Sequence, residues 1–211
     1  MMAEPISYAN EVKRKLIHLS SLWMPAVMLI FAGYRWYLAA VFFILGAGNV
    51  LVEHIYASMK YPRFNALYNF FFGRMLRFEV QKGMWIISGG PYVFGSAFLS
   101  LLLFVPWIAA CGMTSMLLGD TAAALVGRKF GRHKTVNGKS LEGVFAFIAA
   151  STLGIVIIAA IVGVSFRGNA LAILLPSVAG CLVELFEKQL KIDDNFSIPV
   201  AVGGVLWLFM N

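Results

Sequence analysis

Seven apolar stretches follow one another along the chain, and short polar or charged segments separate them. A helix rises about 1.5 Å per residue, so crossing a bilayer takes roughly 20 mostly apolar residues. The last stretch is short for this purpose, and the others are near the required length. The pattern predicts an all-α, polytopic transmembrane helix bundle with about seven spans, at residues 16–33, 36–53, 84–104, 106–127, 141–164, 169–187 and 196–210.

The composition agrees with a membrane protein. Hydrophobic residues make up 60% of the chain and charged residues 13%, with a mean hydropathy of +0.81, whereas soluble domains are about 45–50% apolar and about 25% charged. We expect residues 1–211 to form a single integral membrane domain with a short interfacial or disordered tail at 1–12. Residues 57–83 interleave aromatic and basic side chains and predict an amphipathic cytoplasmic segment in the headgroup region, or else an ordered cap over the active site. In the third stretch, Gly89, Gly90 and Pro91 predict a packing kink or a broken helix.

The charged residues fall on one side of this predicted topology. With seven spans and a cytoplasmic N-terminus, all of the 17 Lys and Arg residues except Arg35 and Arg167 lie in cytoplasmic segments, as the positive-inside rule requires. The ten acidic residues follow the same side, which that rule does not demand. The net charge of +7 is then a cytoplasmic field, suited to anionic headgroups or a phosphorylated substrate. Nucleic acid is a poor partner, because the spans hold the basic loops close to the bilayer.

One segment, LLGDTAAALVGRKFGRHKTVNGKSLEG at 117–143, places an aspartate inside an apolar run and follows it with glycines and cations. Asp120 would lie about 10 Å inside the cytoplasmic end of its span. An ionised group at that depth is costly and should be paired or coordinated, so Asp120 is a candidate Mg²⁺ ligand. Backbone amides at glycines, beside fixed cations, suit a polyphosphate. We therefore predict a basic nucleotide-binding loop at 128–140, with contacts from Gly119, Gly127, Arg128, Gly131 and Lys134.

The sequence GKSLEG at 138–143 extends this segment into the next span. Lys139 can contact a phosphate, and Ser140 opens the span at a helix N-terminus, which favours anions. Glu142 is expected near the cytoplasmic end of the bundle, close to Asp120, where it would be a second metal ligand. A Walker A loop is excluded, because His133 stands where its first glycine is required and a transmembrane helix, not a strand, precedes it. A basic loop that merely anchors to headgroups would explain the cations but neither carboxylate.

Further candidates lie on the same predicted face. Asp194 and Asn195 follow the sixth span and are plausible nucleotide contacts, although Asn195 is equally suited to cap the last helix. A lone histidine such as His18 is more often a packed residue than a catalyst. The residues assigned here to lipid contact or to support of the site are Lys15, His18, Glu53, Glu79 and Glu184.

Taken together, these motifs resemble the CTP-dependent polyprenol kinases, a family that includes dolichol kinase, phytol kinase and a fungal diacylglycerol kinase. The resemblance covers most of the chain, and the order and spacing of the motifs are more specific than any one of them. It rests on KRKLIH at 13–18, LRFE at 76–79, GDTAAALVGRKFGRHK at 119–134, GKSLEG at 138–143 and DDNFSIPV at 193–200.

The resemblance implies transfer of the γ-phosphate of CTP to a lipid alcohol, with Mg²⁺ and with Asp120, Lys139 and Glu142 as catalytic residues. The protein would be a multi-pass membrane protein, in the inner or plasma membrane of a prokaryote or the endoplasmic reticulum of a eukaryote, with its active site facing the cytosol. Two alternatives remain. A phosphatidate cytidylyltransferase carries a similar glycine-aspartate stretch, but this chain lacks that family's K-R-x(4)-K-D and H-G-G signature. A transporter of an anionic lipid would need polar residues toward the outer face, where almost none occur. No residue in the sequence indicates which lipid alcohol is the acceptor or which oligomeric state the protein adopts.

Overall fold

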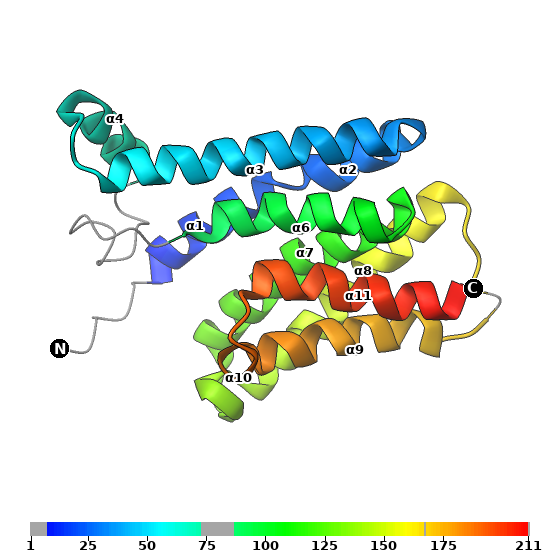
Figure 1. Cartoon of the computed structure of the whole chain (residues 1–211). Coiled ribbons are helices and arrows are strands. Elements are labelled where there is room, and N and C mark those ends of the chain that lie inside the picture. The colour runs from blue at the N-terminus through cyan, green and yellow to red at the C-terminus, as the bar shows by residue number, and fades with distance from the viewer. Residues whose placement is uncertain (1–7, 73–86, 167, 211) are drawn as a thin grey trace.

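The computed structural model describes residues 8–72, 87–166 and 168–210 (Figure 1). Within these ranges the regular elements are helices, and the only β-type contact is an isolated bridge between Lys134 and Ser140. The all-α prediction is therefore confirmed for the described residues. The helices are α1 (Tyr8–Ser20), α2 (Trp23–Ile30), η1 (Ala32–Tyr34), α3 (Arg35–Ala57), α4 (Pro62–Phe72), α6 (Gly89–Leu103), α7 (Pro106–Phe130), η2 (Val136–Gly138), α8 (Leu141–Val162), α9 (Leu171–Leu185), α10 (Glu187–Leu190) and α11 (Asp194–Met210).

Three helical segments are long and apolar enough to cross a membrane, namely Ala32–Ala57, α7 and α8. The helices α6, α9 and α11 are apolar as well but shorter, with 15, 15 and 17 residues. The membrane character of the chain is thus supported by these helices. The count of seven spans and the cytoplasmic position of the N-terminus stay predictions.

The N-terminal part of the chain differs from the predicted pattern. The stretch expected to form one span at 16–33 is divided, because α1 ends at Ser20 and α2 begins at Trp23 after a turn. Residues Tyr8–Val12, expected in a disordered or interfacial tail, form the start of α1. This helix carries buried Glu11 and Lys15 among exposed side chains, so these two charged residues belong to the protein interior and not to a tail.

Two other segments match the predictions in part. Helix α4 lies within the amphipathic segment predicted at 57–83, of which residues 73–83 fall outside the described residues. Helix α6 begins at Gly89 with Ser88 as its N-cap, whose side chain accepts a hydrogen bond from the amide of Gly90. Pro91 therefore stands in the first turn, where proline costs no helical hydrogen bond. The Gly-Gly-Pro sequence marks a helix start, and a kink is not needed to explain it.

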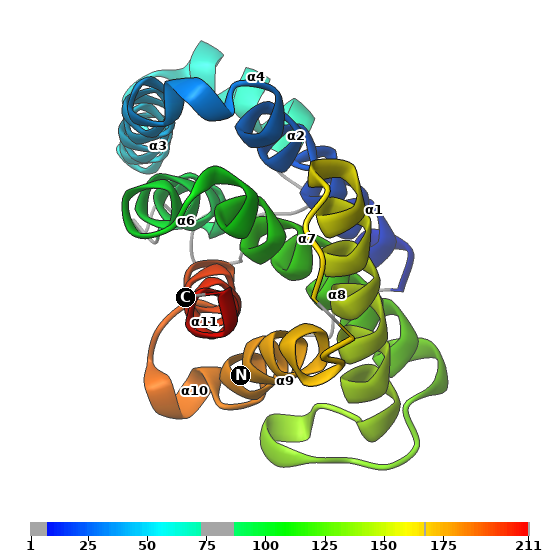
Figure 2. The ribbon, with the colours of Figure 1, turned by 90° about the vertical axis from the view of Figure 1, so that its right-hand side faces the viewer.

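Helix α7 forms the centre of the bundle. It packs against α1, α2, α6, α8, α9 and α11, and seen along the bundle it lies inside the ring of the other helices (Figure 2). Residues 108–117 of α7 are all buried. Asp120 lies only three residues beyond this stretch, so the most central helix also carries the candidate metal ligand.

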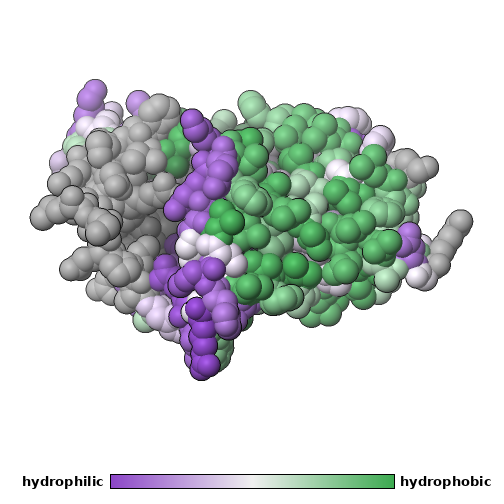
Figure 3. Space-filling view, turned by 90° about the horizontal axis from the view of Figure 1, so that it is seen from below, coloured by the Kyte–Doolittle hydropathy of each residue, from purple (hydrophilic) through white to green (hydrophobic). Residues whose placement is uncertain are grey.

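The outer surface divides into two regions. Large apolar side chains of α3, α8 and α11 are exposed, among them Ile44, Phe145 and Leu208. The face in Figure 3 is hydrophobic over most of its length and ends in a hydrophilic band at the side where α1 and α10 lie in Figure 1. Such a surface suits helices in contact with lipid, with the polar side chains gathered at one end.

Candidate active site

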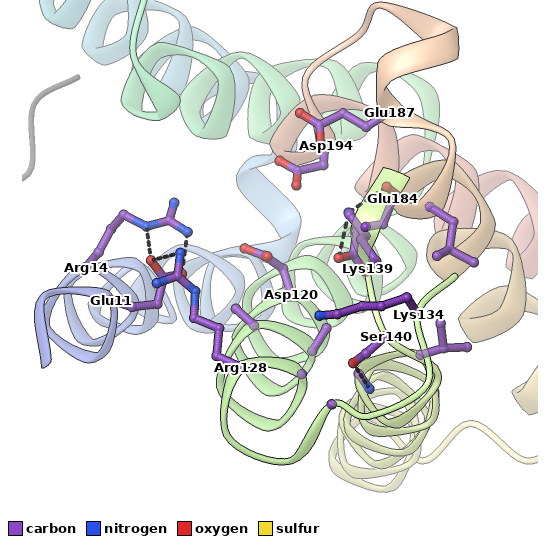
Figure 4. A pocket seen from close by; sticks show the side chains of 18 of the residues that line it. Glu11, Arg14, Asp120, Arg128, Lys134, Lys139, Ser140, Glu184, Glu187 and Asp194 are labelled. Carbon is purple, nitrogen blue, oxygen red and sulfur yellow. Dashed lines mark hydrogen bonds and ion pairs between the residues drawn. The ribbon is translucent and has the colours of Figure 1, made fainter. Parts of the chain in front are cut away.

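A cavity of about 650 Å³ opens at the hydrophilic end of the bundle. Its size is within the range of about 300–1,000 Å³ that is typical of small-molecule sites. Its walls come from α1, α7, the loop after α7, and the adjoining ends of α8 to α11 (Figure 4). The predicted site residues that line it are Asp120, Gly127, Arg128, Gly131, Lys134, Lys139, Ser140, Glu184 and Asp194.

Asp120 lies in the wall of this cavity and is held by α1. The Lys15 ammonium donates to Oδ2 of Asp120 at 2.5 Å, and Nε2 of His18 lies 3.3 Å from the same oxygen. Lys15 and Asp120 are both buried, at 2% and 8% exposure. The two α1 residues predicted as lipid or supporting contacts therefore adjoin the candidate metal ligand, and Lys15 compensates its charge.

A second group of carboxylates faces Asp120 across the cavity (Figure 4). Asp194 and Glu187 line the cavity, and with Asp193 they offer oxygens that all lie within 4.8 Å of one another. Carboxylate oxygens are the donors that Mg²⁺ prefers, usually one or two of them together with phosphate oxygens. The cluster of Glu187, Asp193 and Asp194, with Asp120 facing it across the cavity, therefore offers the kind of donors that a magnesium–nucleotide complex requires.

The acidic cluster changes the titration of Asp194, which precedes the apolar part of α11. Burial, together with the charges of Asp120, Glu187 and Asp193, raises the pKa of its carboxyl group to about 8, although the charge of Lys139 acts in the opposite direction. In the unfolded chain the same group ionises near pH 4. Stability must therefore fall as the pH rises from about 4 to about 8, since only the unfolded state has lost its proton there.

We predict that Asp194→Asn removes this slope. In detergent, without divalent cations, the wild-type thermal midpoint should fall between pH 5 and pH 8, and the variant should exceed it at pH 8 by at least about 2 °C. Glu142→Gln serves as the control, because its carboxylate lies outside the cluster, and it should keep the wild-type slope. Equal slopes in the wild type and Asp194→Asn would show that Asp194 is already ionised.

The loop 131–140 crosses the end of α7 at very short range. A Cβ atom at Gly131 would lie 2.1 Å from the carbonyl oxygen of Gly127 and 2.6 Å from Oγ of Ser140. Ser140 is the N-cap of α8, accepting a hydrogen bond from the amide of Gly143 at 3.2 Å. The lack of a side chain at Gly127 and Gly131 thus lets Ser140 and the start of α8 approach the end of α7 closely enough to line the cavity.

Side chains fix the other half of this loop to α9 and α10. The Lys139 ammonium donates to the carbonyl oxygen of Glu184 at 2.6 Å and to its carboxylate at 2.8 Å. The Asn137 amide donates to the carbonyl oxygen of Leu185 and to Gln189, both at 2.7 Å. Lys139 is therefore held at the cavity edge by a mostly buried carboxylate, and Glu184 acts on the site through it.

Several predicted site residues lie elsewhere. Glu142 does not line the cavity, because on the first turn of α8 its Oε1 lies 2.9 Å from Nδ1 of His133. Gly119 packs against the ring of Phe147, which explains the need for glycine there by close packing alone. Asn195 is the second residue of α11 and does not cap it, contrary to the capping interpretation. Its backbone amide and side-chain amide donate to Oδ1 of Asp193 at 3.1 and 2.8 Å, so Asp193 takes the capping position.

Among the described residues, Glu53 is a further candidate that does not line the cavity. The buried carboxylate of Glu53 accepts hydrogen bonds from the backbone and side chain of Ser88, and so ties α3 to the start of α6. Glu79 lies outside the described residues. Their predicted roles in lipid contact stay predictions.

Of the cavity-wall residues that were not among the predicted site residues, those with polar or charged side chains are Tyr8, Glu11, Arg14 and Glu187. Arg14 stands inside the KRKLIH motif, and Glu11 precedes it by one helical turn, a spacing that places both on one helix face. That spacing was the available signal, but it becomes informative only once residues 8–12 are known to be helical.

Comparisons with known proteins agree with the pattern of motifs. The chain is 28% identical over 192 residues to the uncharacterized protein RP860 of Rickettsia prowazekii, covering 90% of both chains. It is 25% identical to the CTP-dependent diacylglycerol kinase 1 of Schizosaccharomyces pombe, over 97% of this chain and 95% of that protein. It is 26% identical to the enzyme of the same name from Saccharomyces cerevisiae, over 96% of this chain and 73% of that protein.

This is a distant similarity to CTP-dependent lipid kinases. It runs over nearly the whole chain, so it includes every helix that lines the cavity. No family model matches the chain, and no solved structure matches it significantly.

Proposed function

We propose that the chain is a CTP-dependent lipid kinase, which transfers the γ-phosphate of CTP to the hydroxyl group of a membrane lipid alcohol. The observation that supports this most strongly is the cavity itself. It joins four cationic side chains to five carboxylates at the hydrophilic end of an apolar bundle, in a chain that is similar throughout to two CTP-dependent diacylglycerol kinases. In this proposal the cavity faces the cytosol, where CTP is available, and the helices span the membrane several times.

The residues divide the work by charge. Mg²⁺, when bound to Asp120, Asp194 and Glu187, would neutralise part of the charge on the phosphates. Arg14, Arg128, Lys134 and Lys139 supply the remaining positive charge from fixed positions, and fixed cations stabilise the charge that spreads over the phosphoryl oxygens during transfer. The start of α8, with Ser140 as its cap, adds the positive end of a helix dipole.

The transfer step balances with an alcohol as acceptor. The lipid oxygen forms a bond to the γ-phosphorus, the bond from that phosphorus to the β–γ bridging oxygen breaks, and CDP leaves with the electron pair. The hydroxyl proton passes to a carboxylate of the cavity. An apolar tail can stay in the bilayer throughout, because the cavity opens at the end of helices whose sides carry exposed apolar residues.

The acceptor is best tested with diacylglycerol first, since both yeast proteins are named for it. Phytol, a polyprenol and dolichol follow, because the family resembled by the motifs uses them. The same cavity would also suit cytidylyl transfer to phosphatidate, a reaction that differs in which phosphorus is attacked.

We predict that label passes to lipid from CTP labelled at the γ-phosphate and not from CTP labelled at the α-phosphate. The protein is purified in detergent and given Mg²⁺ with diacylglycerol, phytol, a polyprenol, dolichol or phosphatidate. Transfer from the γ position identifies the kinase and its acceptor. Transfer from the α position into phosphatidate would replace the kinase proposal by cytidylyl transfer.

A further inference from the structure

Glu11 is a buried carboxylate placed between two arginines that line the cavity. Its side chain is 2% exposed, on the first turns of α1. Arg14 follows one helical turn later, and Arg128 comes from the last turn of α7. The three side chains come together at one wall of the cavity (Figure 4).

The contacts use both oxygens of Glu11. Arg14 donates from Nη2 to Oε1 at 2.7 Å and from Nε to Oε2 at 3.3 Å, the two-pronged arrangement that fixes a guanidinium plane. Nη2 of Arg128 lies 3.4 Å from Oε2. Arg14 thereby gives two of its five N–H groups to Glu11, and its side chain is still 49% exposed at the cavity.

The charges explain why the carboxylate is needed. Two guanidinium groups beside one another repel. A single buried carboxylate between them offsets this repulsion, and the three side chains together still carry a net positive charge. Burial raises the pKa of the Glu11 carboxyl group, but the hydrogen bond and charge of Arg14, with the charges of Arg128 and Lys15, lower it below its usual value overall. The carboxylate therefore stays ionised at neutral pH.

We infer that Glu11 is a positioning residue, which holds Arg14 and Arg128 side by side as a clamp for the polyphosphate of the nucleotide. The inference rests on the proposed function, since it assigns the phosphate-binding part of that site. Glu11 touches no substrate itself and acts through the two arginines. A simple electrostatic role would have the opposite effect, because removing a negative charge from the wall of an anion site should tighten binding.

The test is the affinity of Glu11→Gln for CTP and for inorganic triphosphate, measured by calorimetry on the detergent-solubilised full chain. We expect the Kd for both to rise about tenfold, since the arginines lose the partner that fixes their geometry. In turnover, KM for CTP should rise by a similar factor with kcat changed less than about threefold. Lys13→Gln, an exposed position on the same helix and outside the cavity wall, should leave Kd unchanged.

A double-variant comparison separates positioning from a general effect on folding. In an Arg128→Ala background, Glu11→Gln should weaken triphosphate binding by less than about threefold, because one of the residues it positions is already gone. An equal loss in both backgrounds would overturn the inference, and so would an unchanged or tighter Kd in the single variant. If Glu11→Gln does not fold, Glu11→Asp replaces it in the same measurement. We expect its Kd for triphosphate to rise two- to threefold, and an unchanged Kd would contradict the inference.

The triphosphate-binding test of Glu11 can fail or succeed independently of the label-transfer test of the kinase proposal. A wild type that binds triphosphate but transfers no label from CTP would refute the proposed reaction, and the effect of Glu11 on triphosphate affinity would still be measurable.

Discussion

Asp120→Asn abolishes transfer of the γ-phosphate, with an expected fall in kcat of at least about a thousandfold. Asparagine keeps the size of the side chain and an oxygen that can accept from Lys15, but it loses the negative charge that we assign to metal binding. Asp194 and Glu187 do not replace this charge, because they belong to a separate carboxylate cluster with Asp193. Initial rates with saturating CTP and Mg²⁺, on protein of verified monodispersity, give the result.

The same substitution affects folding, and the two effects must be separated. Lys15 is 2% exposed and donates to Asp120 at 2.5 Å, and loss of one partner from a buried pair typically costs about 3–5 kcal/mol. We expect a lowered thermal midpoint for Asp120→Asn, which the double variant Lys15→Met/Asp120→Asn should largely restore while remaining inactive. A folded single variant with more than about a tenth of wild-type activity contradicts the role assigned to Asp120.

Much of the site could be predicted because its central residues are close together in the sequence. Asp120, the glycines of 127 and 131, and the cations of 128–139 belong to one segment, and a carboxylate inside an apolar run is a strong signal by itself. The structure brings Asp120, Gly127, Arg128, Gly131, Lys134, Lys139 and Ser140 of this segment to one cavity, but not Gly119 and Glu142.

The remainder depends on tertiary packing. Glu11 and Glu187 reach the cavity from helices that are distant in sequence from α7, and no pattern in the sequence indicates that either of them lies near Asp120. The break between α1 and α2 at Ser21–Leu22 has neither glycine nor proline at the turn. A hydropathy window averages over such a break. Glu142 shows the limit of depth as a criterion, because the first turn of α8 turns its side chain toward His133 and not toward Asp120.

The close crossing of loop 131–140 over α7 gives the second large effect. In Gly131→Ala the added methyl group would lie 2.1 Å from a backbone oxygen and 2.6–2.7 Å from two atoms of Ser140, distances that require the loop to move. Lys134, Lys139 and the cap of α8 lie on or next to this loop and would move with it. We expect CTP affinity and kcat/KM to fall at least about tenfold, and stability to fall by about 1–3 kcal/mol. Calorimetric titration and thermal unfolding measure these two effects.

Alanine substitutions at two further glycines extend the Gly131→Ala experiment to a graded series, because the atoms around each glycine are known. At Gly127 a methyl group would lie 3.0 Å from Oγ of Ser140 and in ordinary contact with Cα of Gly143, at 3.6 Å, and a hydroxyl can rotate away more easily than a backbone can shift. At Gly204, inside α11, it would meet nothing within 4 Å, so alanine there should be neutral or slightly stabilising through its helix propensity. The expected order of damage to CTP affinity is Gly131→Ala, then Gly127→Ala, then Gly204→Ala. If all three bind CTP equally well, the position of the loop does not control the site, and the lysines it carries are not phosphate ligands. If Gly131→Ala alone loses affinity while its thermal midpoint stays within about 3 °C of the wild type, the crossing serves the cavity more than the fold.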